Sequence, residues 1–215
     1  MIWRMRCATR SNAGWPAVTE STPASAAPDP GAVLRVARFF HDPRGSMRAL
    51  LQSNPREARL LAYIVIASAI LLLERIARVL AEAGPDTNIA ARVMEQTVSL
   101  IFFLPLLYYA LAALGTGIVR MMGGVKSWYL SRAALFWAAL VSAPVILLSG
   151  MAAIAAGPDG WMPDVLRQIG PFFFAWAIAC CYAEAFAFSS IAKVLGVIVV
   201  IALVPFGLVW ALTAT

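Results

Sequence analysis

The stretch DPRGSMRALLQSNPREARLLAYIVIASAILLLERIARVL, residues 42–80, decides the fold of this chain. Its uncharged core, residues 60–73, spans only about 21 Å at 1.5 Å per residue, which is shorter than a ~30 Å hydrocarbon layer. Continuing the run to residue 80 gives 21 residues, which is long enough to cross a bilayer. We therefore predict a first transmembrane helix over about 59–80, entered from a basic segment.

Both ends of this helix carry local signals. Asn54 is expected to be its N-cap, because Pro55 follows in the first turn and Glu57 comes three residues after the cap. Near the other end, Glu74 and Arg78 lie four residues apart and are predicted to form an ion pair on one helix face.

The composition is that of a polytopic membrane protein. Of the 215 residues, 61% are hydrophobic and 13% are charged, and the mean hydropathy is +0.79. A soluble domain averages about 25% charged residues, so this chain has too few to cover a water-facing surface. The net charge of +6 does not indicate nucleic-acid binding, because the basic residues cluster beside the apolar runs, where membrane topology requires them. The preference for Arg over Lys and the abundant Ala favour a bacterial source, and hence the bacterial inner membrane.

Four further apolar runs follow the first. Pro105, Pro144 and Pro205 lie inside three of them and predict kinks. Trp161, Asp164 and Arg167 are expected in a short polar loop before the fourth span. The later spans are predicted over about 98–119, 133–156, 170–188 and 194–213. The expected fold class is therefore all-α, a bundle of five transmembrane helices preceded by a basic amphipathic segment.

Two regions precede the first span. Residues 1–30 lack apolar periodicity and are rich in Ser, Thr, Ala and Pro, which predicts a disordered tail. Residues 31–53 are amphipathic, and the helix is expected to restart at Asp42-Pro43. Such a segment either lies in the lipid headgroup layer or packs on the protein's own loops, and the sequence leaves both open. The candidate lipid-contacting residues are Arg35, Arg38, Arg44 and Arg48.

The distribution of basic residues predicts the orientation. The segment before the first span and the loop between the second and third spans are strongly basic, and the turn before the fifth carries Lys193. On the opposite side, Arg92 and Arg167 stand beside acidic residues. The positive-inside rule therefore places the N-terminus in the cytoplasm and the C-terminus in the periplasm.

The sequence contains few candidate catalytic residues. The single histidine, His41, excludes a Ser-His protease and a histidine-based zinc site. No aspartate lies in a predicted span, and no phosphate-binding glycine motif occurs. We expect no catalytic residues, no metal and no cofactor. Glu184 is the one isolated acidic residue of an apolar helix, and it is either a functional group or a structural partner of a nearby basic residue, for which Arg132 is the expected choice.

Small residues indicate where helices pack closely. Ala175, Ala179, Ala183 and Ala187 recur every four residues along the fourth span, and Gly115 and Gly117 lie near the end of the second. Such faces let helix backbones approach each other, either inside the bundle or in a homodimer.

Short basic and proline-containing signatures precede the first and third spans: Asp-Pro-Arg at 42–44, Met-Arg-Ala-Leu-Leu at 47–51, Pro-Arg-Glu at 55–57 and RAALFWA at 132–138. With the five-span layout, they make residues 33–213 resemble the bacterial branch of the Yip-domain family of integral membrane proteins. The resemblance implies a cytoplasmic N-terminal segment and five clustered spans. Eukaryotic relatives are associated with Rab GTPases, but their Asp-Leu-Tyr-Gly-Pro motif is absent here, so GTPase binding is not implied.

These patterns favour a non-enzymatic scaffold or accessory protein of membrane organisation or of a larger membrane complex. The alternative is a small transporter or a lipid-handling protein that acts as an oligomer. An apolar, well-packed bundle favours the first, whereas polar residues lining a cavity favour the second. The expected partners are membrane lipids, with a second copy or other membrane proteins, and no nucleic acid.

Overall fold

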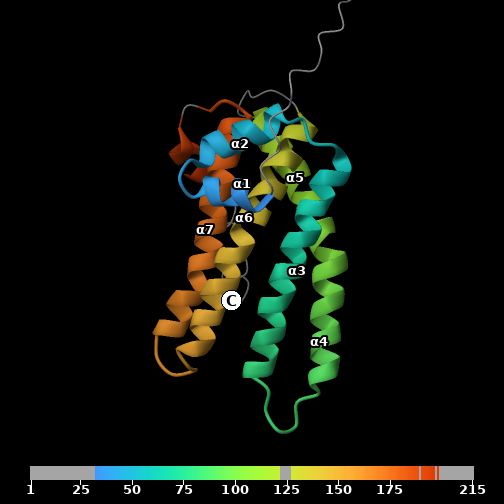
Figure 1. Cartoon of the computed structure of the whole chain (residues 1–215), viewed down its shortest axis with the longest axis vertical. Helices are drawn as coiled ribbons and strands as arrows, with labels where there is room; N and C mark the ends of the chain where they lie inside the picture. The colour runs from blue at the N-terminus through green and yellow to red at the C-terminus, as the bar shows by residue number, and fades with distance from the viewer. Residues whose placement is uncertain (1–31, 122–126, 189, 197, 199–215) are drawn as a thin grey trace, which may run out of the picture.

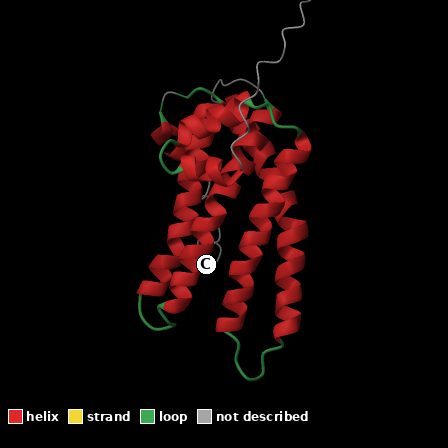
Figure 2. Ribbon diagram, in the orientation of Figure 1, coloured by secondary structure: helices red, strands yellow, loops and turns green. Residues whose placement is uncertain are grey.

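The computed structural model describes residues 32–121, 127–188, 190–196 and 198, and this part of the chain contains helices and no strands (Figures 1 and 2). The elements are α1 (Ala32–Phe39), α2 (Pro43–Gln52), α3 (Glu57–Ala81), α4 (Ile89–Val98), the π-helical segment η1 (Ser99–Phe103), α5 (Leu104–Met121), α6 (Trp128–Ala155) and α7 (Met162–Ala185). The predicted tail over residues 1–30 lies outside the described residues.

Four helices in the described part are long and apolar enough to cross a membrane: α3, the continuous helix Ile89–Met121, α6 and α7. They run side by side, and α1 and α2 cross one end of the bundle (Figure 1). We call α1 and α2 the N-terminal helix pair, and this end of the bundle the helix-pair end. Residues 191–196 and 198 of the chain after α7 are helical, and most of the predicted fifth span, 194–213, lies outside the described residues.

The centre of the bundle is α6. All residues from 133 to 143 are buried, so this half of the helix is covered on every side. The helix packs on α7, α3 and α5. An α-helix that is apolar all round is typical of a position inside a bundle, which explains why its sequence shows no polar face.

The helix break at residues 40–42 follows the sequence prediction. The Asp42 side chain accepts a hydrogen bond from the Gly45 N–H at 2.8 Å, and Pro43 occupies the first turn of α2. An acceptor at the N-cap followed by proline is a strong helix start, because the first N–H groups of a helix lack partners within it.

The predicted role of Asn54 is wrong. Asn54 adopts a left-handed conformation with φ 40°, and its N–H bonds to the carbonyl of Leu51, so it terminates α2. Asparagine tolerates this conformation better than most residues do. Helix α3 begins at Glu57, after Arg56, and no side chain caps it.

The second membrane-length helix begins at Ile89, nine residues before the predicted start at Val98. It contains a π-helical segment directly before Pro105, in which the Leu104 N–H bonds to the Ser99 carbonyl. A proline ring clashes with the carbonyl four residues earlier in a regular α-helix, and a wider turn gives it room. The irregularity predicted at Pro105 therefore takes the form of a π-turn.

The fourth membrane-length helix also begins earlier than expected. Helix α7 starts at Met162 with Pro163 in its first turn, so Asp164 and Arg167 are helical and the predicted polar loop is wrong there. Pro171 was expected near the start of this span but lies inside the helix. Pro163 and Pro171 both suit the first turn of a helix, and the predicted start of this span was the one near Pro171.

Candidate functional site

The N-terminal helix pair is attached to α7 by aromatic side chains. Phe39 meets the ring of Trp176 edge-on, with 5.9 Å between centroids, and Phe40 stacks on Phe173 at 5.5 Å. The fully buried side chains of the pair are Phe39, Met47 and Leu50. The amphipathic segment therefore packs on the protein, which is one of the two placements that the sequence left open. It packs on a helix, α7, and not on loops.

The same helix pair also exposes apolar side chains. Val33 is 84% exposed, Leu34 51% and Phe40 48%, and the exposed Arg38 lies on the same helix. The pair thus has buried apolar side chains against the bundle, and it also carries apolar and basic side chains, Val33, Leu34 and Arg38, that the bundle leaves exposed.

Three of the four arginines proposed for lipid contact bond to the protein. Arg35 donates to the Ser53 hydroxyl at 3.5 Å and Arg44 to the Phe188 carbonyl at 3.5 Å. Arg48 Nε donates to Glu184 Oε1 at 2.8 Å, and this bond raises the pKa of Arg48 above its ordinary value. The Arg48 side chain is still 63% exposed, so it ties α2 to α7 and also faces outward.

The predicted pair between Arg132 and Glu184 is wrong. Arg132 instead binds Glu57 through two hydrogen bonds of 2.6 and 2.8 Å, and Glu184 binds Arg48. The first turn of α6 faces the start of α3, whereas the last turn of α7 faces α2. Glu184 is therefore a structural partner of a basic residue, but the arginine comes from the N-terminal helix pair.

Further contacts fix the first turn of α6. Arg132 lies over the ring of Trp128 at 5.4 Å and that of Tyr109 at 6.0 Å. The Tyr129 hydroxyl donates to the Pro55 carbonyl at 3.0 Å. These contacts hold the start of α6 against the start of α3, beneath the helix pair.

Glu74 and Arg78 form the ion pair expected from their spacing. The Glu74 side chain is only 2% exposed, and Arg75 approaches its other oxygen at 3.7 Å. Glu74 lies against Gly150 of α6, where an added Cβ would stand 2.7 Å from Glu74 Cγ. Gly150 is not among the residues predicted from the sequence to pack closely, although a glycine inside an apolar run is a signal for such an approach.

The alanine ridge of α7 is partly buried. Ala179 and Ala183 are buried, Ala175 is half-buried, and Ala187 lies beyond the end of the helix with φ 53°. The ridge therefore ends at Ala183. Its buried members lie on the helix that packs most extensively against α6, so packing inside the bundle accounts for them.

A polar contact that was not predicted from the sequence joins α5, α6 and α7. The buried Ser131 hydroxyl donates to the Ala112 carbonyl at 2.8 Å and lies 2.7 Å from the Tyr182 hydroxyl. Gly115 makes room for this contact, because an added Cβ there would stand 2.4 Å from the Tyr182 hydroxyl oxygen. Of the two glycines expected to pack closely, Gly117 has no neighbour within 4 Å of an added Cβ.

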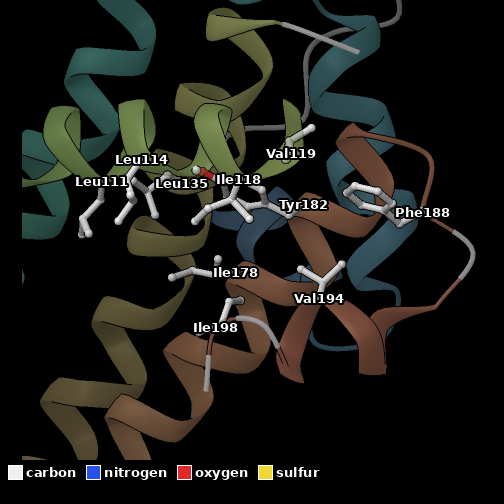
Figure 3. Close-up of a pocket in the computed structure, with 11 residues that line it drawn as sticks. Leu111, Leu114, Ile118, Val119, Leu135, Ile178, Tyr182, Phe188, Val194 and Ile198 are labelled. Carbon is white, nitrogen blue, oxygen red and sulfur yellow. The ribbon is translucent and has the colours of Figure 1, made fainter. Parts of the chain in front are cut away.

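Beside this contact lies an apolar cavity of about 140 Å³ between α5, α6, α7 and the chain after α7 (Figure 3). Apolar side chains surround it, and the Tyr182 hydroxyl is the polar group of its lining side chains. We call it the α5–α7 cavity. Its lining residues include Leu114, Ile118, Ile178, Val194 and Ile198.

Two of the ion pairs described above, Arg48–Glu184 and Arg132–Glu57, join different helices. Within the described residues, no group of three His, Cys, Asp or Glu side chains is placed to hold a metal ion. No family model, curated protein or solved structure matches this chain, so its resemblance to the Yip-domain family stays a prediction.

Proposed function

We propose that this chain is a non-enzymatic, five-span protein of the bacterial inner membrane that acts as a scaffold or accessory in membrane organisation or in a larger membrane complex. Four membrane-length helices support the membrane location. The fifth span, 194–213, is proposed because these 20 residues carry no charge. The basic segments of the sequence place the helix-pair end in the cytoplasm.

The N-terminal helix pair carries the proposal. Phe40 stacks on Phe173, which lies 12 residues before the end of α7 and so about 18 Å along the helix axis. We place the end of α7 at the outer edge of the headgroup layer. This layer is much thinner than the distance to Phe173, so in this placement Phe40 stands at the depth of acyl chains. The exposed faces of Val33, Leu34 and Phe40 are then covered by lipid, and the arginines lie near the headgroups.

A helix pair in this position couples the spans to one leaflet. Its inner face is held by aromatic contacts and by the pair between Arg48 and Glu184, while its outer face displaces lipid. Such an element adds area to the cytoplasmic leaflet beside the bundle and gives the protein a surface on which lipids or other spans can be organised. No bond-making chemistry is needed for this role.

A lipid-handling protein is the second candidate, because the α5–α7 cavity is lined by apolar side chains. Transport of polar solutes is not favoured, since a path for them needs polar lining groups. Reconstitution into liposomes separates the two functions. If the protein is a scaffold, lipid exchange between leaflets should be as slow as in liposomes without the protein. Faster exchange in liposomes that contain the protein would favour lipid handling.

The depth of the helix pair can be measured with a nitroxide label on Val33→Cys in nanodiscs, with Gln52→Cys as the matched exposed control on α2. We expect the label at position 33 to be reached by oxygen, which partitions into lipid, and shielded from a water-soluble nickel chelate. The label at position 52 should be reached by the chelate. The unsubstituted chain controls for labelling of the native cysteines. Equal chelate access at both positions would refute the proposal.

A further inference from the structure

The α5–α7 cavity has the volume of a site for one small apolar group. Its volume is about 140 Å³, and apolar side chains form most of its wall. A cavity of about 150 Å³ lined by Leu, Ile and Phe holds benzene in another protein. The α5–α7 cavity differs from such a site in one respect, because its described lining side chains include one polar group, the Tyr182 hydroxyl.

The Tyr182 hydroxyl lies at the wall of the cavity that α5 forms. Figure 3 shows the Tyr182 side chain extending from α7 toward α5. Gly115 of α5 also lines the cavity, and a Cβ added there would overlap the Tyr182 hydroxyl oxygen. A molecule in the cavity therefore meets the hydroxyl end of the tyrosine at a position where α5 has no side chain.

The hydrogen bonds of this hydroxyl have a defined direction. The Ser131 oxygen lies 2.8 Å from the Ala112 carbonyl oxygen, and a carbonyl has no hydrogen, so the single Ser131 hydroxyl hydrogen lies in this contact. The Tyr182 oxygen stands 2.7 Å from the same Ser131 oxygen, and this contact also needs a hydrogen. Tyr182 is therefore the donor to Ser131. The Tyr182 oxygen can still accept a hydrogen bond, but it has no hydrogen left to donate.

An apolar cavity whose polar group accepts but does not donate selects an apolar molecule that carries a donor. We propose that the α5–α7 cavity binds a membrane-soluble alcohol or phenol, with its apolar part against the cavity wall and its hydroxyl donating to the Tyr182 oxygen. A plain hydrocarbon chain fits the wall but leaves this acceptor without a partner, and an ether oxygen would face it without a hydrogen between them. This binding site goes beyond the scaffold role and does not depend on it.

Binding is tested on the full chain in nanodiscs by fluorine NMR, with para-fluorophenol and para-fluoroanisole as probes. Empty nanodiscs correct for partition of the probes into lipid. The two probes share a ring, but para-fluoroanisole has a methoxy group and no donor. A typical net hydrogen bond corresponds to about a fivefold difference in affinity, so the wild type should bind para-fluorophenol about fivefold more tightly. Equal affinities of the wild type for both probes would overturn the proposal.

Two substitutions test the hydroxyl itself. Tyr182→Phe retains the ring and removes the acceptor, so the preference for para-fluorophenol should disappear. Ser131→Ala frees the Tyr182 hydrogen for donation to the methoxy oxygen of para-fluoroanisole, so the preference should fall there as well. Tyr108→Phe is the matched control and should retain the preference, because Tyr108 is buried to the same degree on α5 and does not line the cavity. An unchanged preference in Tyr182→Phe or in Ser131→Ala would overturn the proposal.

A filled cavity distinguishes binding at this site from binding elsewhere on the protein. Ile118→Phe fills the lined space and should weaken the binding of both probes. Leu148→Phe, at a 69% exposed position of α6 that does not line the cavity, should leave both affinities unchanged. The chain's own residues 199–213 are the competing occupant, because they follow Ile198 at the cavity wall. Equal binding by the wild type and Ile118→Phe would favour such an occupant and overturn the proposal.

Discussion

The two arginines beside Glu74 allow a matched test of how a buried charge is compensated. Arg78 bonds directly to Glu74 and its side chain is 27% exposed, whereas Arg75 stays 3.7 Å away and is 48% exposed. The carboxylate itself is 2% exposed and packed against Gly150. Replacing either arginine with Met retains most of the apolar stem, so the two variants differ mainly in which charge is lost.

The expected losses differ severalfold. Removing one partner of a buried ion pair costs about 3–5 kcal/mol, and we expect Arg78→Met to lie at the lower end because Arg75 still faces the carboxylate. Arg75→Met should cost below about 1 kcal/mol, as is usual for exposed pairs. Glu74→Met combined with Arg78→Met leaves no buried charge without a partner, because the remaining Arg75 is 48% exposed, and it should cost less than Arg78→Met alone.

The assay is thermal unfolding of each purified variant in the same mild detergent. A loss of about 3 kcal/mol lowers the midpoint by about 6–12 °C for a chain of this size. Equal midpoints for Arg75→Met and Arg78→Met would show that the direct bond is not the main compensation. A double variant less stable than Arg78→Met would refute the argument that a stranded carboxylate causes the loss.

Two further variants test contacts between helices. Arg132→Ala and Glu57→Ala together should cost less stability than the sum of their separate losses, with a coupling of about 0.5–1 kcal/mol because Glu57 is half exposed. The losses from Arg132→Ala and Glu184→Ala should instead be additive. The same thermal assay decides between these two pairings. Gly115→Ala should destabilise the protein by about 1–3 kcal/mol, because the added Cβ meets the Tyr182 hydroxyl. Gly117→Ala should be neutral or slightly stabilising, because the space around its added Cβ is open. Equal effects of the two substitutions would contradict the close approach at Gly115.

Local patterns in the sequence predicted local structure well. The apolar runs identified the helices now seen as membrane-length, and the Asp42-Pro43 signal placed a helix start. The spacing of Glu74 and Arg78 was sufficient to predict their pair, because residues four apart on a helix are always neighbours. Each of these inferences needs only the helix period and not the position of any other helix.

Helix boundaries were harder to predict from the sequence where one residue type is compatible with both a helix start and a helix end, or where two residues offer alternative starts. Asn54 suits both the end of one helix and the start of the next, and the structure uses it as the end. Pro163 and Pro171 are both acceptable first-turn residues, so the sequence could not decide between a start at 162 and one near 170. In both cases one residue type satisfies two different backbone conformations.

Contacts between helices depend on how each helix is rotated about its axis, and hydropathy does not specify this rotation in a nearly uncharged span. The partner of Arg132 was therefore predicted on the wrong helix. The contact between Ser131 and Tyr182 was missed for the same reason, since neither residue marks a polar face within its own helix.

Close glycine contacts occur between the membrane-length helices of the bundle and not between the N-terminal helix pair and α7, among the residues that the structure describes. Apolar surface alone does not drive helices together in lipid, so close packing and polar contacts must specify their positions. A glycine in close contact marks two interfaces: Gly150 lies between α6 and α3, and Gly170 lies between α7 and α6. Gly115 of α5 makes room for the Tyr182 hydroxyl of α7. In the described residues, the helix pair meets α7 through aromatic rings and an ion pair whose arginine is 63% exposed, without such a glycine. We expect the stacked rings of Phe40 and Phe173 and the exposed ion pair to tolerate small displacements better than a close glycine contact does, because stacked rings can slide and an exposed ion pair can exchange with water. We therefore expect the helix pair to be the element whose position responds most readily to the surrounding lipids, as the proposed contact between the spans and one leaflet requires.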